Sequence, residues 1–152
     1  MGMSQPEIPD VSFEDSQFGI FHLDRLVNWF EGETNWGSQP VRLCLSVEDD
    51  LDFKGALKVA QTLWNSQADW NQKVYDCGIT KLLAVKNDFW LQNGEEKITA
   101  EEFRIRMTLE SITVSPYGGI EFWFDDGDLF WGHTIMIEGS ISEGPTDARF
   151  EG

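Results

Sequence analysis

Apolar and polar side chains alternate in the first third of the chain, and this alternation predicts β-strands. Over residues 41–47 every second side chain is apolar, which places Val41 and Leu43 on one face of a half-buried antiparallel strand. Residues 18–23 and 26–30 are short runs rich in β-forming residues and predict two earlier strands. We therefore expect a three-stranded meander, with a turn at residues 33–40 where the composition is polar and rich in glycine and proline.

The spacing of apolar residues becomes helical between about residues 50 and 92, and we expect two helices there. Asp49 or Asp50 is a suitable N-cap for the first helix. The pattern breaks at residues 66–69, and a second helix follows, with Gly78 as a weak point in its interior.

A short helical turn and further strands are expected in the last third. Residues 99–102 have the S/T-x-x-E form of a capping box, which predicts a helical turn. Alternation returns at residues 107–114, 120–124 and 129–141, with a turn at residues 116–119.

The order of strands, helices and strands predicts an α+β fold. We expect a mainly antiparallel sheet, made of the N-terminal meander and C-terminal hairpins, packed with two central helices. Residues 17–152 would form this single domain. Residues 1–16 mix proline, acids and serine without periodicity, and we expect a loosely ordered leader there.

The sequence Asp125-Asp-Gly-Asp128 between two aromatic strands is the most informative stretch of the chain. Asp-Gly in this setting predicts a two-residue type I′ hairpin turn at Asp126 and Gly127. Asp125 would then pair with Asp128, and His133 would fall on the apolar face of the hairpin.

Three aspartates at a turn allow two interpretations. Asp125, Asp126 and Asp128 can serve the turn itself, because aspartate accepts hydrogen bonds from nearby backbone N–H groups. Alternatively, they can gather oxygens for a hard cation or for a basic group of a partner, although the full calcium-loop pattern is missing.

Three aromatic side chains complete this set of candidate binding residues. His133 is either a packed, hydrogen-bonded histidine or a catalytic or ligand-binding one. Trp123 and Trp131 either belong to the core or line a cleft.

Familiar catalytic and cofactor motifs do not occur, so the sequence predicts no catalytic residue, no metal ligand set and no cofactor. The two cysteines, Cys44 and Cys77, are far apart and have the pattern of neither a disulfide framework nor a zinc site.

Charge excludes some partners. The net charge is −16, with −9 over residues 1–53, +1 over residues 54–106 and −8 over residues 107–152. Such a field repels nucleic acids and anionic lipid surfaces and allows a basic protein partner. The acidity can also serve solubility alone. No apolar run is long enough to span a bilayer and no secretory signal is seen, so we expect a cytoplasmic protein.

Phe124-Asp-Asp-Gly-Asp-Leu-Phe-Trp-Gly-His-Thr-Ile135 resembles the signature of an uncharacterised bacterial family, a domain of unknown function with a DDGDLFWGH motif. Residues 18–21, 81–91 and 148–152 are similar to that family in order and spacing. The resemblance implies no activity. Proteins of this sort are associated with bacterial toxin–immunity systems.

Three hypotheses about function follow. The first is an acidic protein-binding module, including an immunity-type protein that covers a basic toxin. The second is a metal-assisted hydrolase built on Asp125, Asp126, Asp128 and His133, which requires these side chains to converge. The third is a structural domain of a larger assembly. The charge distribution favours binding over catalysis.

Overall fold

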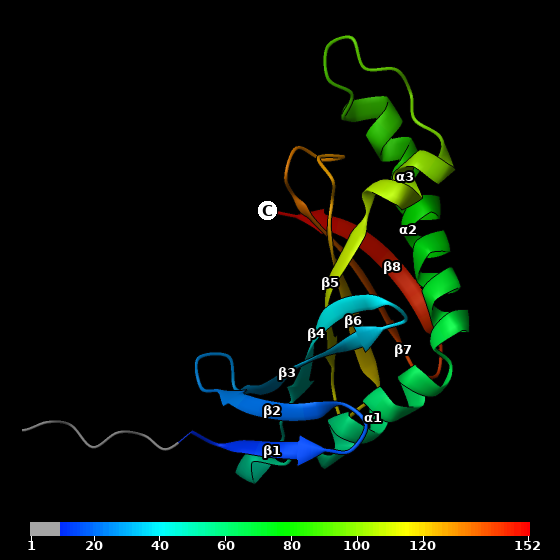
Figure 1. Ribbon diagram of the computed structural model, residues 1–152. Coiled ribbons are helices and arrows are strands. Elements are labelled where there is room, and N and C mark those ends of the chain that lie inside the picture. Colours follow the sequence, from blue (N-terminus) through cyan, green and yellow to red (C-terminus); the bar gives the residue numbers. More distant parts are fainter. Residues whose placement is uncertain (1–9) are drawn as a thin grey trace, which may run out of the picture.

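A computed structural model describes residues 10–152. Within this range eight strands form one sheet in the order β1-β2-β3-β4-β5-β6-β7-β8 (Figure 1). The strands are β1 (Ser12–Asp15), β2 (Gly19–Asp24), β3 (Trp29–Trp36), β4 (Gln39–Ser46), β5 (Thr108–Val114), β6 (Gly119–Asp125), β7 (Thr134–Ser140) and β8 (Gly144–Glu151). The helices are α1 (Lys54–Asn65), α2 (Gln67–Phe89) and α3 (Ala100–Arg106), with a short 3-10 turn at Asp49–Leu51.

All neighbouring strands are antiparallel except β4 and β5, which are parallel. Parallel neighbours need a crossover, and the segment that contains α1, α2 and α3 supplies it. α1 packs against β4 and β5, while α2 runs along β8. The α+β class and the mainly antiparallel sheet are confirmed.

Several local predictions need correction. The N-terminal meander has four strands, because Ser12–Asp15 of the expected leader pairs with β2. Residues 1–9 of that leader lie outside the described range. The polar segment 33–40 is strand rather than turn over most of its length, and only Gly37 and Ser38 connect β3 to β4. The last strand, β8, has no counterpart in the prediction.

The structure has helices in the regions where the sequence predicts them. The two expected helices are α1 and α2, separated only at Ser66, whose backbone is not helical. The first helix begins at Lys54, so neither Asp49 nor Asp50 caps it. The helical turn predicted from residues 99–102 is confirmed as the start of α3, and the Thr99 side chain caps it by accepting a hydrogen bond from the backbone N–H of Glu102 at 3.1 Å.

One face of the sheet and the helices enclose the core. Along α2 every fourth side chain is buried, the spacing that keeps a stripe of a helix against a sheet; these residues are Trp70, Val74, Gly78, Leu82 and Lys86. Helix α2 continues through Gly78, which packs closely against β7: a β-carbon there would lie 2.9 Å from the end of the Ile137 side chain.

No helix within residues 10–152 is long and apolar enough to cross a membrane. The helices cover one face of the sheet, and the other face carries the outward side chains of β2 to β8. We call this second face the open face; the residues used below are His22, Asp24, Trp29, Glu31, Glu33, Arg42, Cys44, Ser111, Thr113, Glu121, Trp123, Glu138, Asp147 and Arg149.

Candidate functional site

The predicted two-residue turn at Asp126 and Gly127 is wrong. β6 ends by pairing Asp125 with Thr134, so residues 126–133 form an eight-residue loop between β6 and β7. His133 therefore does not pair with Ile120, and Asp125 does not pair with Asp128. The expected long strand over residues 129–141 begins only at Thr134.

The Asp126 side chain organises this loop. It is 1% exposed, and its carboxylate accepts hydrogen bonds from the backbone N–H groups of Asp128, Phe130 and Gly132 at 2.9, 2.9 and 3.1 Å. These bonds satisfy buried donors that would otherwise cost free energy. Asp126 thus fulfils the structural interpretation of the aspartates, and its oxygens are occupied by the protein's own backbone.

Close contact with α3 explains the glycine that follows. Gly127 has a φ of +54°, and a β-carbon there would lie 2.3 Å from the Arg106 carbonyl oxygen. The Arg106 guanidinium donates to the Gly127 carbonyl oxygen from Nε at 3.0 Å and from Nη2 at 2.7 Å. Both the backbone and the side chain of Arg106 therefore contact Gly127, and together they hold the loop against α3.

An aromatic cluster joins the loop to the ends of α2 and β8. The Trp90 ring makes edge-to-face contacts with Phe130, Trp131, His133 and Phe150 at centroid distances between 4.7 and 5.8 Å. These residues come from residues 81–91, 124–135 and 148–152, three of the four stretches that carry the resemblance described above. These three stretches therefore meet at one packing centre of the fold.

The sequence-predicted residues of this loop have different surroundings. His133 is half-buried, and its Nδ1 hydrogen-bonds with the Phe130 carbonyl oxygen. Trp131 is 52% exposed with a φ of +59°, and Asp128 is exposed with a φ of +63°. Asp125 lies at the exposed end of β6.

These side chains do not converge on one point. In the part of the chain that the structure describes, no three His, Cys, Asp or Glu side chains gather where they could hold a metal ion. The hydrolase hypothesis requires such a convergence, and the geometry gives it no support.

The open face is where polar groups line up. One row of neighbouring residues crosses seven strands from β2 to β8 and consists of His22, Glu31, Cys44, Thr113, Glu121, Glu138 and Asp147. Because directly paired residues point to the same side of a sheet, these side chains share one face. Four of the seven are acids.

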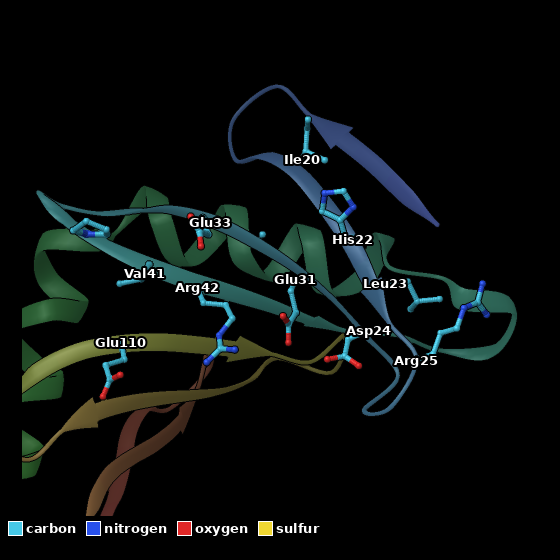
Figure 2. Close-up of a pocket in the computed structure, with 12 residues that line it drawn as sticks. Ile20, His22, Leu23, Asp24, Arg25, Glu31, Glu33, Val41, Arg42 and Glu110 are labelled. Carbon is cyan, nitrogen blue, oxygen red and sulfur yellow. The ribbon is translucent and has the colours of Figure 1, made fainter. Parts of the chain in front are cut away.

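A groove lies on this face, over β2, β3 and β4. Its volume is about 1080 Å³, and its charged lining residues are Asp24, Arg25, Glu31, Glu33, Arg42 and Glu110. Figure 2 shows Asp24, Glu31 and Arg42 pointing to the side of the strands away from the helix behind them. Carboxylates outnumber guanidinium groups in this groove.

A smaller depression of about 380 Å³ lies beside the groove, over β4 and β5. Its floor contains the small side chains of Cys44, Ser111 and Thr113, and Trp29 and Trp123 stand at its sides. We call it the trough; Arg42, Glu110, Glu121 and Thr134 complete its lining. Trp123 is the one sequence-predicted site residue among those that line it.

Burial shifts the pKa values of two groups of the open face, Cys44 and Glu121. Burial raises the pKa of the Cys44 thiol to about 12, and the nearby Glu31 carboxylate adds to this effect. Cys44 is therefore a protonated thiol near neutral pH and not a nucleophile. Burial also raises the pKa of Glu121, as does Glu138 on the neighbouring strand, while Arg149 acts in the opposite direction.

Sequence reasoning missed most of this surface. Arg42 and Cys44 stood out only as the polar alternates of a predicted strand, and nothing local connected them with Glu31 or Glu121. The polar face of residues 41–47 was the one available signal. The register that aligns β3, β4, β5 and β6 is not readable from the chain.

Comparison with known proteins gives one match. A family model described as an uncharacterised protein conserved in bacteria (DUF2262) matches residues 15–150. No curated protein and no solved structure matches the chain.

Proposed function

We propose that this chain, which belongs to the DUF2262 family of uncharacterised bacterial proteins, is a binding module whose open face receives a basic protein. The observation that carries the proposal is the acidic groove of the open face, lined by Asp24, Glu31, Glu33 and Glu110. A sheet face without covering helices is available to a partner, and its charge selects a partner of opposite sign.

Net negative charge is concentrated in the segments of the chain that supply the strands. The strand-rich residues 1–53 and 107–152 carry −9 and −8, whereas residues 54–106, which contain α1, α2 and α3, carry +1. The helical segment holds seven acids as well, but its eight bases balance them, whereas residues 1–53 hold 11 acids and two bases and residues 107–152 hold nine acids and one base. The scarcity of bases in the strand-rich segments leaves their carboxylates uncompensated, which supports the binding interpretation.

An immunity-type role is the specific form of this proposal. A protein that neutralises a basic toxin needs a rigid acidic surface more than a catalytic centre, and the open face has that character. An immunity-type protein would meet its toxin in the cytoplasm. The immunity-type role also requires that the basic partner is toxic alone and harmless in the complex.

The test is affinity capture from the native host with three forms of the protein as bait. One is wild type, one is Glu31→Gln with Glu33→Gln in the groove, and the control is Glu96→Gln with Glu101→Gln. The two double variants remove the same charge, and the control acids are exposed residues before and in α3.

We expect wild type and control to retain the same basic protein and the groove variant to lose most of it. Retention of that protein by the groove variant together with its loss from the control would contradict the proposal. Retention of an acidic protein by all three baits would contradict it too.

A further inference from the structure

The trough has the size and the lining of a site for one long side chain. Its volume of about 380 Å³ lies at the lower end of the range of about 300–1,000 Å³ found for small-ligand pockets. Cys44, Ser111 and Thr113 contribute only small side chains to its lining. An indole at either side and a carboxylate on β6 provide the two kinds of group that recognise a cation in proteins.

Glu121 is the carboxylate in question. It is half-buried, and among residues 10–152 no hydrogen bond or ion pair engages its side chain. Partial burial without a partner is unfavourable for a charged carboxylate, which is consistent with its raised pKa. A cation placed in the trough would relieve this cost.

Trp29 and Trp123 provide aromatic surfaces on the same face as Glu121. The Trp29 indole N–H donates to the Glu31 carboxylate at 2.6 Å, which fixes the ring and increases its negative character. Trp123 lies two residues after Glu121 on the same strand and therefore on the same face. A cationic group beside Glu121 thus has an aromatic surface near it.

We propose that the trough holds one arginine side chain of the basic partner, with its guanidinium paired to Glu121 and stacked on an indole of the trough. This inference rests on the proposed function and names the group that the open face recognises. A planar guanidinium stacks on an indole and pairs bidentately with a carboxylate, and the point charge of lysine does neither as well.

The charged groups that surround the trough leave room for only one cationic side chain of a partner. Arg42 lines the same depression, and its neighbours across the strands are Glu33 and Ser111. A second basic side chain would meet the Arg42 guanidinium. Glu138 faces Glu121 from β7 and adds negative potential, and Arg149 on β8 is engaged with Glu138 at 3.4 Å and with Glu151 at 2.6 Å.

N-acetyl-argininamide is the probe for the test, and N-acetyl-citrullinamide, which has the same shape without the charge, is its control. The readout is the NMR signal of each indole N–H group, assigned with Trp29→Phe and Trp123→Phe. We expect saturable shifts of the Trp29 and Trp123 signals with arginine, weaker shifts with N-acetyl-lysinamide and none with citrulline.

Glu121→Gln should weaken arginine binding about three-fold or more, and each Phe variant should weaken it about two- to five-fold. Glu96→Gln should leave it unchanged. Equal shifts with citrulline, or no saturable shift with arginine up to about 50 mM, would overturn the inference. If that happens while Glu31→Gln with Glu33→Gln still impairs capture of a basic protein, the trough inference fails and the proposed function stands.

Discussion

The carboxylate of Asp126 lies 2.9 Å from the backbone nitrogen of Phe130, four residues further along the chain. This bond, with those from Asp128 and Gly132, folds the loop between β6 and β7 into a compact unit that buries Leu129 and Phe130. Asp126, the central residue of the acidic motif, therefore has a structural role, and the proposed partner would meet the acids of the open face instead.

Replacing Asp126 by Ala should destabilise the protein by about 3 kcal/mol, because it leaves three backbone N–H groups without their acceptor. Asp128→Ala is the matched control and should cost less than about 1 kcal/mol, since the Asp128 side chain is exposed. Urea denaturation measures both. Equal costs for the two variants would show that Asp126 does not organise the loop.

Gly127→Ala should destabilise by about 2 kcal/mol or more, because the added methyl group would collide with the Arg106 carbonyl at a positive φ. Gly94→Ala separates the effect of the collision from the effect of the positive φ. Gly94 has a φ of +80° with nothing within 4 Å of the added carbon, so it should cost only about 1 kcal/mol. The denaturation midpoints of both variants decide the matter, and a Gly94 variant as unstable as the Gly127 variant would disprove the collision.

Glu95 links stability to pH. The hydrogen bond from the buried Lys86 ammonium, at 2.8 Å, is the main cause that lowers the pKa of Glu95 below its ordinary value of 4.5. A carboxylate whose pKa is lowered by folding stabilises the protein above that value and loses the effect as the pH falls below it.

Glu95→Gln should therefore cost about 2 kcal/mol at pH 7, and the difference from wild type should shrink as the pH drops below about 4.5. Thermal or urea unfolding between pH 3 and 7 measures this difference. A gap that stays constant down to pH 3 would refute the assignment.

Cys44 should resist alkylation although it lies on the open face. Its thiol is buried, and its pKa of about 12 leaves almost no thiolate at pH 8. Cys77 is only half-buried and should react with iodoacetamide at least about ten-fold faster. Mass spectrometry of the native protein follows both sites. Rapid labelling of Cys44 before unfolding would mean that the floor of the trough is more open than described.

The sequence is sufficient to predict a local structure that depends only on residues close together along the chain. The α3 cap is an example, because Thr99 and Glu102 lie three residues apart. Long-range contacts explain the failures. Asp126 and Gly127 read as a tight turn, but side-chain bonds to residues up to six positions away and the Arg106 contact produce a longer loop.

Strand pairing explains the remaining differences. Residues 33–36 are polar and turn-like in composition, yet pairing with β4 makes them strand. In β8, Ala148 is the one buried side chain, and the apolar alternation of this strand is too weak to predict it from the sequence. Glu31 and Glu121 are 90 positions apart along the chain, and only the order of the strands sets them in one row.

On the proposed function, the acids of the open face attract a basic partner. Stopped-flow measurement of association between the captured partner and the wild type, the groove variant (Glu31→Gln with Glu33→Gln) and the control (Glu96→Gln with Glu101→Gln) tests it most directly. Salt screens such attraction over a Debye length of about 8–10 Å near physiological ionic strength.

We predict that the association rate of wild type and control falls steeply from low to physiological ionic strength while dissociation changes little. The groove variant should associate several-fold more slowly at low salt, with a flatter dependence. Salt-independent association, or a larger effect of the control than of the groove variant, would contradict the account.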